Sequence, residues 1–170
     1  MTAAEIFLFL YFPSLMAFAA ASDLTTMTIP NRVSVLLLAG FAVMAPLTGM
    51  SLPAFGMHLL GGLVIFGICF TFFAMGWMGG GDAKLATATA VWVGWTHIFE
   101  YALVAAVLGG LMTVFILSAR GMPFPMLLAR FGWLERHHRP ETGIPYGIAL
   151  AAAGLLIYPQ IAIWKSVIAA

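Results

Sequence analysis

The chain has 170 residues, of which 63% are hydrophobic and only 8% are charged, and its mean hydropathy is +1.06. These values exclude an ordinary soluble domain and are typical of a membrane protein with several spans, so the lipid bilayer is its first expected partner. The net charge of +1 is accompanied by no basic patch, and nucleic-acid binding is therefore not expected.

A helix needs about 20 apolar residues to cross a bilayer core. Six stretches are predicted to do so, at 4–22, 33–50, 54–77, 83–96, 98–118 and 143–164. The first ends in small residues that imitate a signal-peptidase site, but Glu5 rather than a basic residue precedes it, so we expect a retained helix. The short fourth stretch either begins inside the membrane or runs almost continuously into the fifth, around Trp95-Thr96-His97. The sequence thus predicts an all-α, polytopic membrane protein with one domain over residues 1–170.

Basic residues are distributed unequally between the two faces of this six-span arrangement. Six of the seven fall in the loops after the first, third and fifth spans, at Arg32, Lys84, Arg120, Arg130, Arg136 and Arg139. Because positive loops stay cytoplasmic, both termini are predicted to lie outside, in a cell inner membrane. The largest of these loops, 119–142, is either an amphipathic segment on the membrane surface or a plain cytoplasmic connector.

Two aspartates end apolar segments on this predicted cytoplasmic face. Asp23 follows the first span, and Asp82 follows the third span and the glycines Gly79, Gly80 and Gly81. An ionisable group in or near a bilayer is costly and usually functional. Each aspartate also has a structural interpretation, Asp23 as a helix-end or turn carboxylate and Asp82 as the N-cap of the fourth helix.

Two carboxylates held close together cannot both ionise cheaply, and the pair titrates as a coupled unit. The charged member can take a proton from water while the protonated member polarises a peptide carbonyl, which is aspartic-protease chemistry and needs no metal or cofactor. The glycines leave bare backbone beside Asp82, and we expect them to let an extended peptide lie close to the acid. Lys84 either tunes the acid pair, contacts an acidic residue of the substrate, or is a simple positive-inside anchor.

Three short motifs, in order along the chain, resemble those of the type IV prepilin peptidases. The run from Gly79 to Leu85 contains the GxGD pattern of intramembrane aspartic proteases. Asp23-Leu24 leading to Ile29-Pro30-Asn31 resembles the region of their first catalytic aspartate, and Ile144-Pro145-Tyr146-Gly147 resembles their C-terminal Pro-Tyr-Gly stretch. The resemblance implies an endopeptidase that removes the leader from prepilins or pilin-like proteins on the cytoplasmic side, with the two aspartates as its catalytic pair.

Larger members of that family carry a cytoplasmic domain with paired CxxC motifs, associated with N-methylation of the cut pilin. This chain has one cysteine, Cys69, and resembles the compact, peptidase-only form found with tight-adherence (Flp-type) pili, so methylation is not expected. Two alternatives stay open: a small proton- or cation-coupled transporter, and a non-enzymatic pilus or secretion assembly factor. His137-His138, with Glu135 and Glu141, forms either a metal site or, as we expect, part of a solvated loop.

Overall fold

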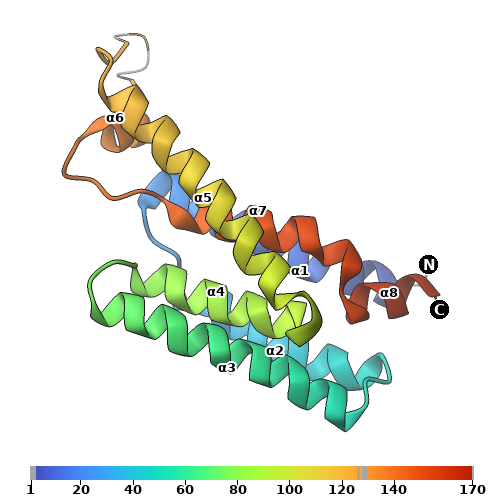
Figure 1. Cartoon of the computed structure of the whole chain (residues 1–170). Helices are drawn as coiled ribbons and strands as arrows, with labels where there is room; N and C mark the ends of the chain where they lie inside the picture. Colours follow the sequence, from blue (N-terminus) through green and yellow to red (C-terminus); the bar gives the residue numbers. More distant parts are fainter. Residues whose placement is uncertain (1–2, 126, 128–129, 170) are drawn as a thin grey trace.

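The computed structural model describes residues 3–125, 127 and 130–169, and the regular elements within them are helices (Figure 1). The prediction of an all-α chain is thereby confirmed for this part of the sequence. The helices are α1 (Ala3–Thr26), α2 (Asn31–Leu47), α3 (Leu52–Ala74), α4 (Gly80–Val93), α5 (Ile98–Arg120), α6 (Gly132–His138), α7 (Tyr146–Ile157) and α8 (Ala162–Ala169), with 3-10 turns at Trp95–His97 and Tyr158–Gln160.

Helix α4 lies at the centre of the bundle and contacts α2, α3, α5 and α7. Its alanines let these neighbours approach closely. Leu85 and Trp92 on α4 are fully buried, and Trp92 Nε1 donates a hydrogen bond of 2.8 Å to the carbonyl of Leu37 on α2. Because protein surrounds α4 on several sides, this helix can be shorter and less apolar than a helix that faces lipid.

Helices α3 and α5 carry much of the exposed apolar surface. Their exposed side chains include Leu59, Leu63, Phe66, Phe70, Leu103, Val107, Leu111 and Phe115. Among the residues described, the two helices long and apolar enough to cross a membrane are Leu52–Ala74 and Trp95–Arg120. A surface of this kind suits lipid rather than water. The six spans and their orientation stay predictions.

The chain breaks between α4 and α5 at Gly94, close to the place where the sequence left the boundary open. Gly94 has a φ of 75°, in the left-handed region that favours glycine. A Cβ there would also lie 2.6 Å from Cε1 of His58 on α3. His58 is buried, and its Nδ1 donates to the carbonyl of Val91 at 2.8 Å, so it is a hydrogen-bonded core residue.

Two features of the second half differ from the predicted spans. The apolar stretch 143–164, predicted as one span, is divided into α7, a 3-10 turn and α8. Pro159 lies in that turn and has no backbone N–H to continue the helix, which explains the break. The loop 119–142 contains α6, which packs beside α1 and α5, and its place on the membrane surface or as a connector stays a prediction.

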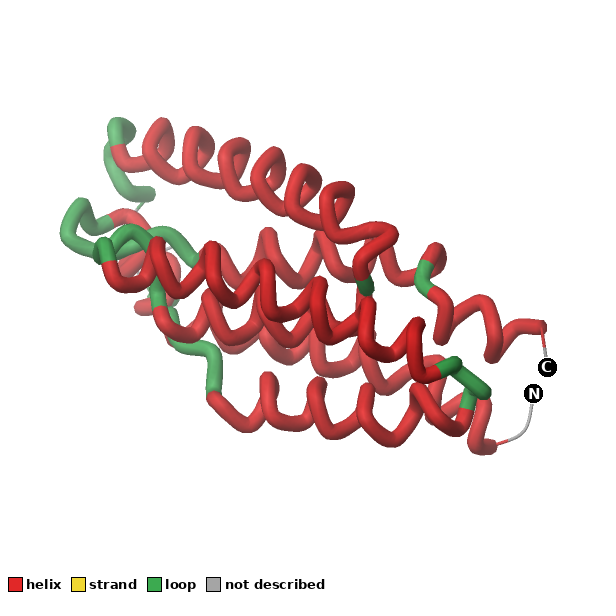
Figure 2. The backbone as a smooth tube through the Cα atoms, turned by 60° about the horizontal axis from the view of Figure 1, so that its bottom comes forward, coloured by secondary structure: helices red, strands yellow, loops and turns green. Residues whose placement is uncertain are grey.

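The connections α3–α4 and α5–α6 lie at one end of the molecule, whereas α8 and the start of α1 lie at the other (Figures 1 and 2). The last turn of α1 and the first turns of α4 and α7 also fall at the α6 end. The fold therefore places Asp23, Asp82 and the start of α7 at the same end of the bundle.

Candidate active site

Asp23 lies in the last turn of α1 and binds the start of α7. Its side chain is buried, and Oδ2 accepts a hydrogen bond of 2.8 Å from the backbone N–H of Gly147, 124 residues away. That N–H belongs to the first turn of α7, where amides lack partners within the helix and carry the positive end of the helix dipole. Asp23 is therefore more than the local helix-end carboxylate of one sequence interpretation.

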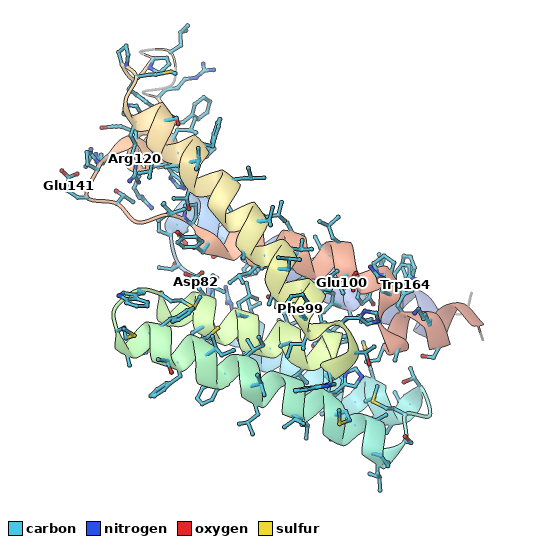
Figure 3. The ribbon with its side chains drawn as sticks, in the orientation of Figure 1. Asp82, Phe99, Glu100, Arg120, Glu141 and Trp164 are labelled. Atoms are coloured by element: carbon cyan, nitrogen blue, oxygen red, sulfur yellow. The ribbon has the colours of Figure 1, made fainter. Side chains whose placement is uncertain are left out.

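Asp82 is the third residue of α4 and half-buried (Figure 3). The interpretation of Asp82 as the N-cap is wrong, because Gly79 occupies that position. The Asp82 carboxylate instead accepts a hydrogen bond from the Gly79 backbone, as an acid at the third helical position does when it reaches back to the cap.

The two carboxylates influence each other, and both lie outside the predicted spans. Burial, and next the negative charge of Asp23, raise the pKa of Asp82 to about 7. Burial also raises the pKa of Asp23, while the Gly147 N–H and the charge of His137 on α6 lower it. A negative charge on Asp23 thus favours the protonated form of Asp82. Two carboxyl groups of which one is charged and one protonated can divide general base and general acid chemistry between them.

Ile29, in the segment between α1 and α2, is buried and packs against the start of α4 and the start of α7. A Cβ on Gly147 would lie 2.6 Å from Ile29 Cδ1 and 2.7 Å from Asp23 Oδ2. A Cβ on Gly81, the neighbour of Asp82, would lie 3.3 Å from Ile29 Cβ. Glycine at both positions thus lets α4 and α7 close on the same side chain.

The three glycines before Asp82 have different surroundings. A Cβ on Gly79 would lie 3.0 Å from Asp82 Oδ2, and one on Gly80 would lie 3.2 Å from Cε2 of Phe73. Gly80 and Gly81 therefore serve close packing, a role that the sequence analysis missed. Gly79 is exposed beside the acid, and the access for a peptide that was expected of these glycines stays a prediction.

The structure does not join Lys84 to the acid pair. Its Nζ donates a hydrogen bond of 2.9 Å to Oδ1 of Asn31, the first residue of α2. Two residues along a helix are about 200° apart, so the Lys84 and Asp82 side chains leave α4 on nearly opposite sides. The prediction that Lys84 contacts the substrate stays a prediction.

Two cavities flank α4. One, of about 660 Å³, lies between α2, α3 and α4 and is lined by Asn31, Gly80 and Lys84. The other, of about 470 Å³, lies between α3, α4, α5 and α7 and is lined by Ala86 and Tyr146. Ala86 is one turn beyond Asp82 on the same face of α4, and Tyr146 precedes Gly147. The second cavity therefore reaches the face of α4 that carries Asp82, although neither acid lines it.

Helix α6 places basic side chains beside Asp23. Arg136 Nη1 donates to the carbonyl of Thr25 at 3.2 Å, in the last turn of α1. His137 Nδ1 donates to the carbonyl of Trp133 at 2.8 Å, because a carbonyl can only accept. His137 is half-buried, and the expectation of a solvated loop stays a prediction. Within the described part of the chain, no group of three His, Cys, Asp or Glu residues could hold a metal ion.

Sequence reasoning missed the roles of Gly147 and His137. The available signal for Gly147 was its place directly after Pro145-Tyr146 at the start of an apolar stretch, where the free amides of a new helix fall. His137 gave no signal of its own, because its distance from Asp23 in sequence hides its position beside that acid.

Comparison with known proteins gives one match. The model of the type IV leader peptidase family matches residues 10–114, which include both aspartates and end before Gly147. No curated protein and no solved structure matches the chain.

Proposed function

The chain belongs to the type IV leader peptidase family, and we propose that it removes the leader from prepilins or pilin-like proteins. Family membership makes it a membrane-embedded peptidase whose substrates are precursors that carry a leader. We propose that Asp23 and Asp82 are its catalytic pair, and that cleavage takes place at the cytoplasmic face of a cell inner membrane. The positive-inside rule supports this orientation, because six of the seven basic residues lie in or beside the connections on that predicted face.

The interaction between the two carboxylates carries this proposal. The Gly147 N–H and His137 favour the charged form of Asp23, and the charge of Asp23 helps to raise the pKa of Asp82 to about 7. We propose that Asp23 is the ionised acid near neutral pH and that Asp82 keeps its proton. An aspartic peptidase requires this division of roles. The family match further favours a peptidase over a transporter or a non-enzymatic assembly factor.

The proposed reaction needs only water and the two side chains. Asp23 accepts a proton from water as the water oxygen attacks the carbonyl carbon of the scissile peptide. Asp82 donates its proton to the carbonyl oxygen, which gives a neutral tetrahedral intermediate. Asp23 then passes its proton to the amide nitrogen, the C–N bond breaks, and Asp82 recovers a proton from the intermediate as the new carboxyl group forms.

The substrate is proposed to approach through the spaces around the first turn of α4. Gly79 is exposed beside the Asp82 carboxylate, and bare backbone at this position allows an extended peptide to lie close to the acid. The cavity of about 470 Å³ reaches Ala86, one turn beyond Asp82 on α4, and can take an apolar part of the precursor. Gly80, Gly81 and Lys84 complete the proposed substrate-binding set, with Gly80 and Lys84 lining the cavity on the other side of α4.

Co-expression with candidate precursors tests this function. A panel of proteins with a short leader before an apolar segment is co-expressed with the full chain, and the product's N-terminus is identified by mass spectrometry. We expect wild type to release the leader, and Asp23→Asn and Asp82→Asn to leave the precursor intact at equal protein levels. Normal processing by either variant would contradict the paired-acid mechanism, and no processing of any precursor by wild type would contradict the proposed substrate class.

A further inference from the structure

We infer that Arg120 is a positioning residue of the active site, which holds the segment before α7 so that the Gly147 N–H reaches Asp23. This inference rests on the proposed function, because it gives Arg120 an effect on the acid that we assign as the base. Arg120 is the last residue of α5, at the same end of the molecule as Asp82 (Figure 3). It acts through the backbone and is not itself a catalytic residue.

The guanidinium of Arg120 joins two segments that follow it in the chain. Nε donates to the carbonyl of His137 at 2.8 Å, and Nη2 donates to the carbonyls of Thr142 at 2.7 Å and Gly143 at 3.0 Å. A planar guanidinium can hold several acceptors in a fixed geometry, which the single ammonium of lysine cannot reproduce. Hydrogen bonds from a charged donor are also stronger than those between neutral groups.

Only a few residues separate this anchor from the amide that binds Asp23. Gly143 is followed by Ile144 and Pro145, and the proline ring restricts the backbone at the entrance to α7. Tyr146 fixes the far end of the segment, because its hydroxyl lies 3.1 Å from Oγ1 of Thr113, a residue of α5. Helix α5 therefore holds the segment on both sides, and the position of the Gly147 N–H follows from these contacts.

The Gly147 amide matters because it opposes the effect of burial on Asp23. Among the described residues, the titratable groups that interact with that carboxylate are Asp82 on α4 and His137 on α6, while Arg136 on α6 bonds the nearby carbonyl of Thr25. Arg120 supports two contacts that favour the anion of Asp23. It holds the segment before the Gly147 N–H through the carbonyls of Thr142 and Gly143, and it holds His137 through the carbonyl of that residue. Loss of Arg120 weakens both, and the pKa of Asp23 should then rise.

A purely structural role for Arg120, as a cation at the end of α5, makes a different prediction. A basic residue in the last turn of a helix stabilises the helix dipole, and lysine does this as well as arginine. Under that role, Arg120→Lys leaves catalysis unchanged. Under positioning, the same variant keeps the charge but loses part of the fixed geometry, so the pH dependence of cleavage changes.

The test compares Arg120→Ala and Arg120→Lys with wild type, using full-length protein in lipid nanodiscs. Arg139→Ala is the matched control, since this arginine of the same loop pairs at 2.8 Å with the exposed Glu135 on α6. The measurements are kcat against pH and hydrogen exchange of the peptide that contains Gly147.

We expect Arg120→Ala to lower kcat about tenfold or more and to speed hydrogen exchange around Gly147. The acid limb of the pH–rate profile, where the rate falls as Asp23 is protonated, should move to higher pH. Arg120→Lys should show the same three changes to a smaller extent, and Arg139→Ala should show none of them. If Arg120→Ala does not fold, Arg120→Lys decides the question. If wild type cleaves but a folded Arg120 variant has an unchanged acid limb and unchanged hydrogen exchange, the inference is overturned. Failure of wild type to cleave would instead overturn the proposed function, and hydrogen exchange would still report on Arg120.

Discussion

The carboxylate of Asp23 accepts a hydrogen bond from the backbone N–H of Gly147, so that the end of α1 and the start of α7 meet at a charged contact. A helix N-terminus favours a negative group, and a hydrogen bond to the anion lowers a carboxyl pKa. Burial acts in the opposite direction on this acid. The contact therefore explains how a buried aspartate can be held ready to act as a base.

Replacing Gly147 with alanine should displace Asp23. The added Cβ would lie 2.7 Å from Asp23 Oδ2 and 2.6 Å from Ile29 Cδ1, closer than real contacts allow. A small displacement of a reacting group can lower a rate about a hundredfold, and we expect a loss of kcat of that order. Gly67→Ala on α3 is the control, because nothing lies within 4 Å of its Cβ position. Similar kcat values for the two folded variants would show that Gly147 does not position the acid.

A bulky residue at Gly81 should abolish cleavage without unfolding the protein. The Cβ position lies 3.3 Å from Ile29 Cβ and 3.6 Å from its carbonyl oxygen, so leucine cannot fit unless the Ile29 segment moves. Gly81→Ala should retain partial activity, because a few tenths of an ångström of adjustment suffice. Leader removal is followed by gel shift, and folding by thermal unfolding in detergent. Full activity of Gly81→Leu would contradict this role.

The rate of cleavage should have a bell-shaped dependence on pH. Asp82 must hold its proton to act as the acid, and its pKa is raised to about 7 by burial and by the charge of Asp23. The rate should therefore fall as the pH rises through about 7, and fall again in acid as Asp23 becomes protonated. The measurement is kcat across this range with a single purified precursor. A rate that stays constant while both acids titrate would count against shared acid–base work.

Substitution of Lys84 should affect substrate binding rather than chemistry. Lys84 bonds Asn31 and lines the cavity on the side of α4 away from the acids. Lys84→Gln is expected to raise KM for the precursor and to leave kcat and the alkaline limb unchanged. Steady-state kinetics at several pH values check this. A shifted alkaline limb would show that Lys84 tunes Asp82 after all.

Helices α1 to α5 follow the predicted apolar stretches, because long apolar runs are typical of helices in a chain of this composition. The division of the last stretch at Pro159 escaped this reasoning, since an average over a window of residues ignores one missing N–H. Helix α4 is the opposite case. Its small residues resemble a marginal span, yet 8 of its 14 residues are buried because α2, α3, α5 and α7 surround it.

The location of the two aspartates was predictable from the charges of the loops. The charge distribution of the loops placed Asp23 and Asp82 on one face without any knowledge of contacts. The Gly147 amide could not be found in this way, because backbone N–H groups occur at every position and only the fold selects one. Lys84 shows the converse: it neighbours Asp82 in sequence but leaves the helix on nearly the opposite side.

The most direct test of the paired acids is a comparison of kcat/KM for Asp23→Asn, Asp82→Asn and the double variant with one purified precursor. Residues that act as a unit are strongly non-additive, because removal of either disables the other. We therefore expect the double variant to be no slower than the slower single variant. Losses that add in free energy, or a single variant that retains wild-type kcat/KM, would contradict the claim that Asp23 and Asp82 work as one catalytic pair.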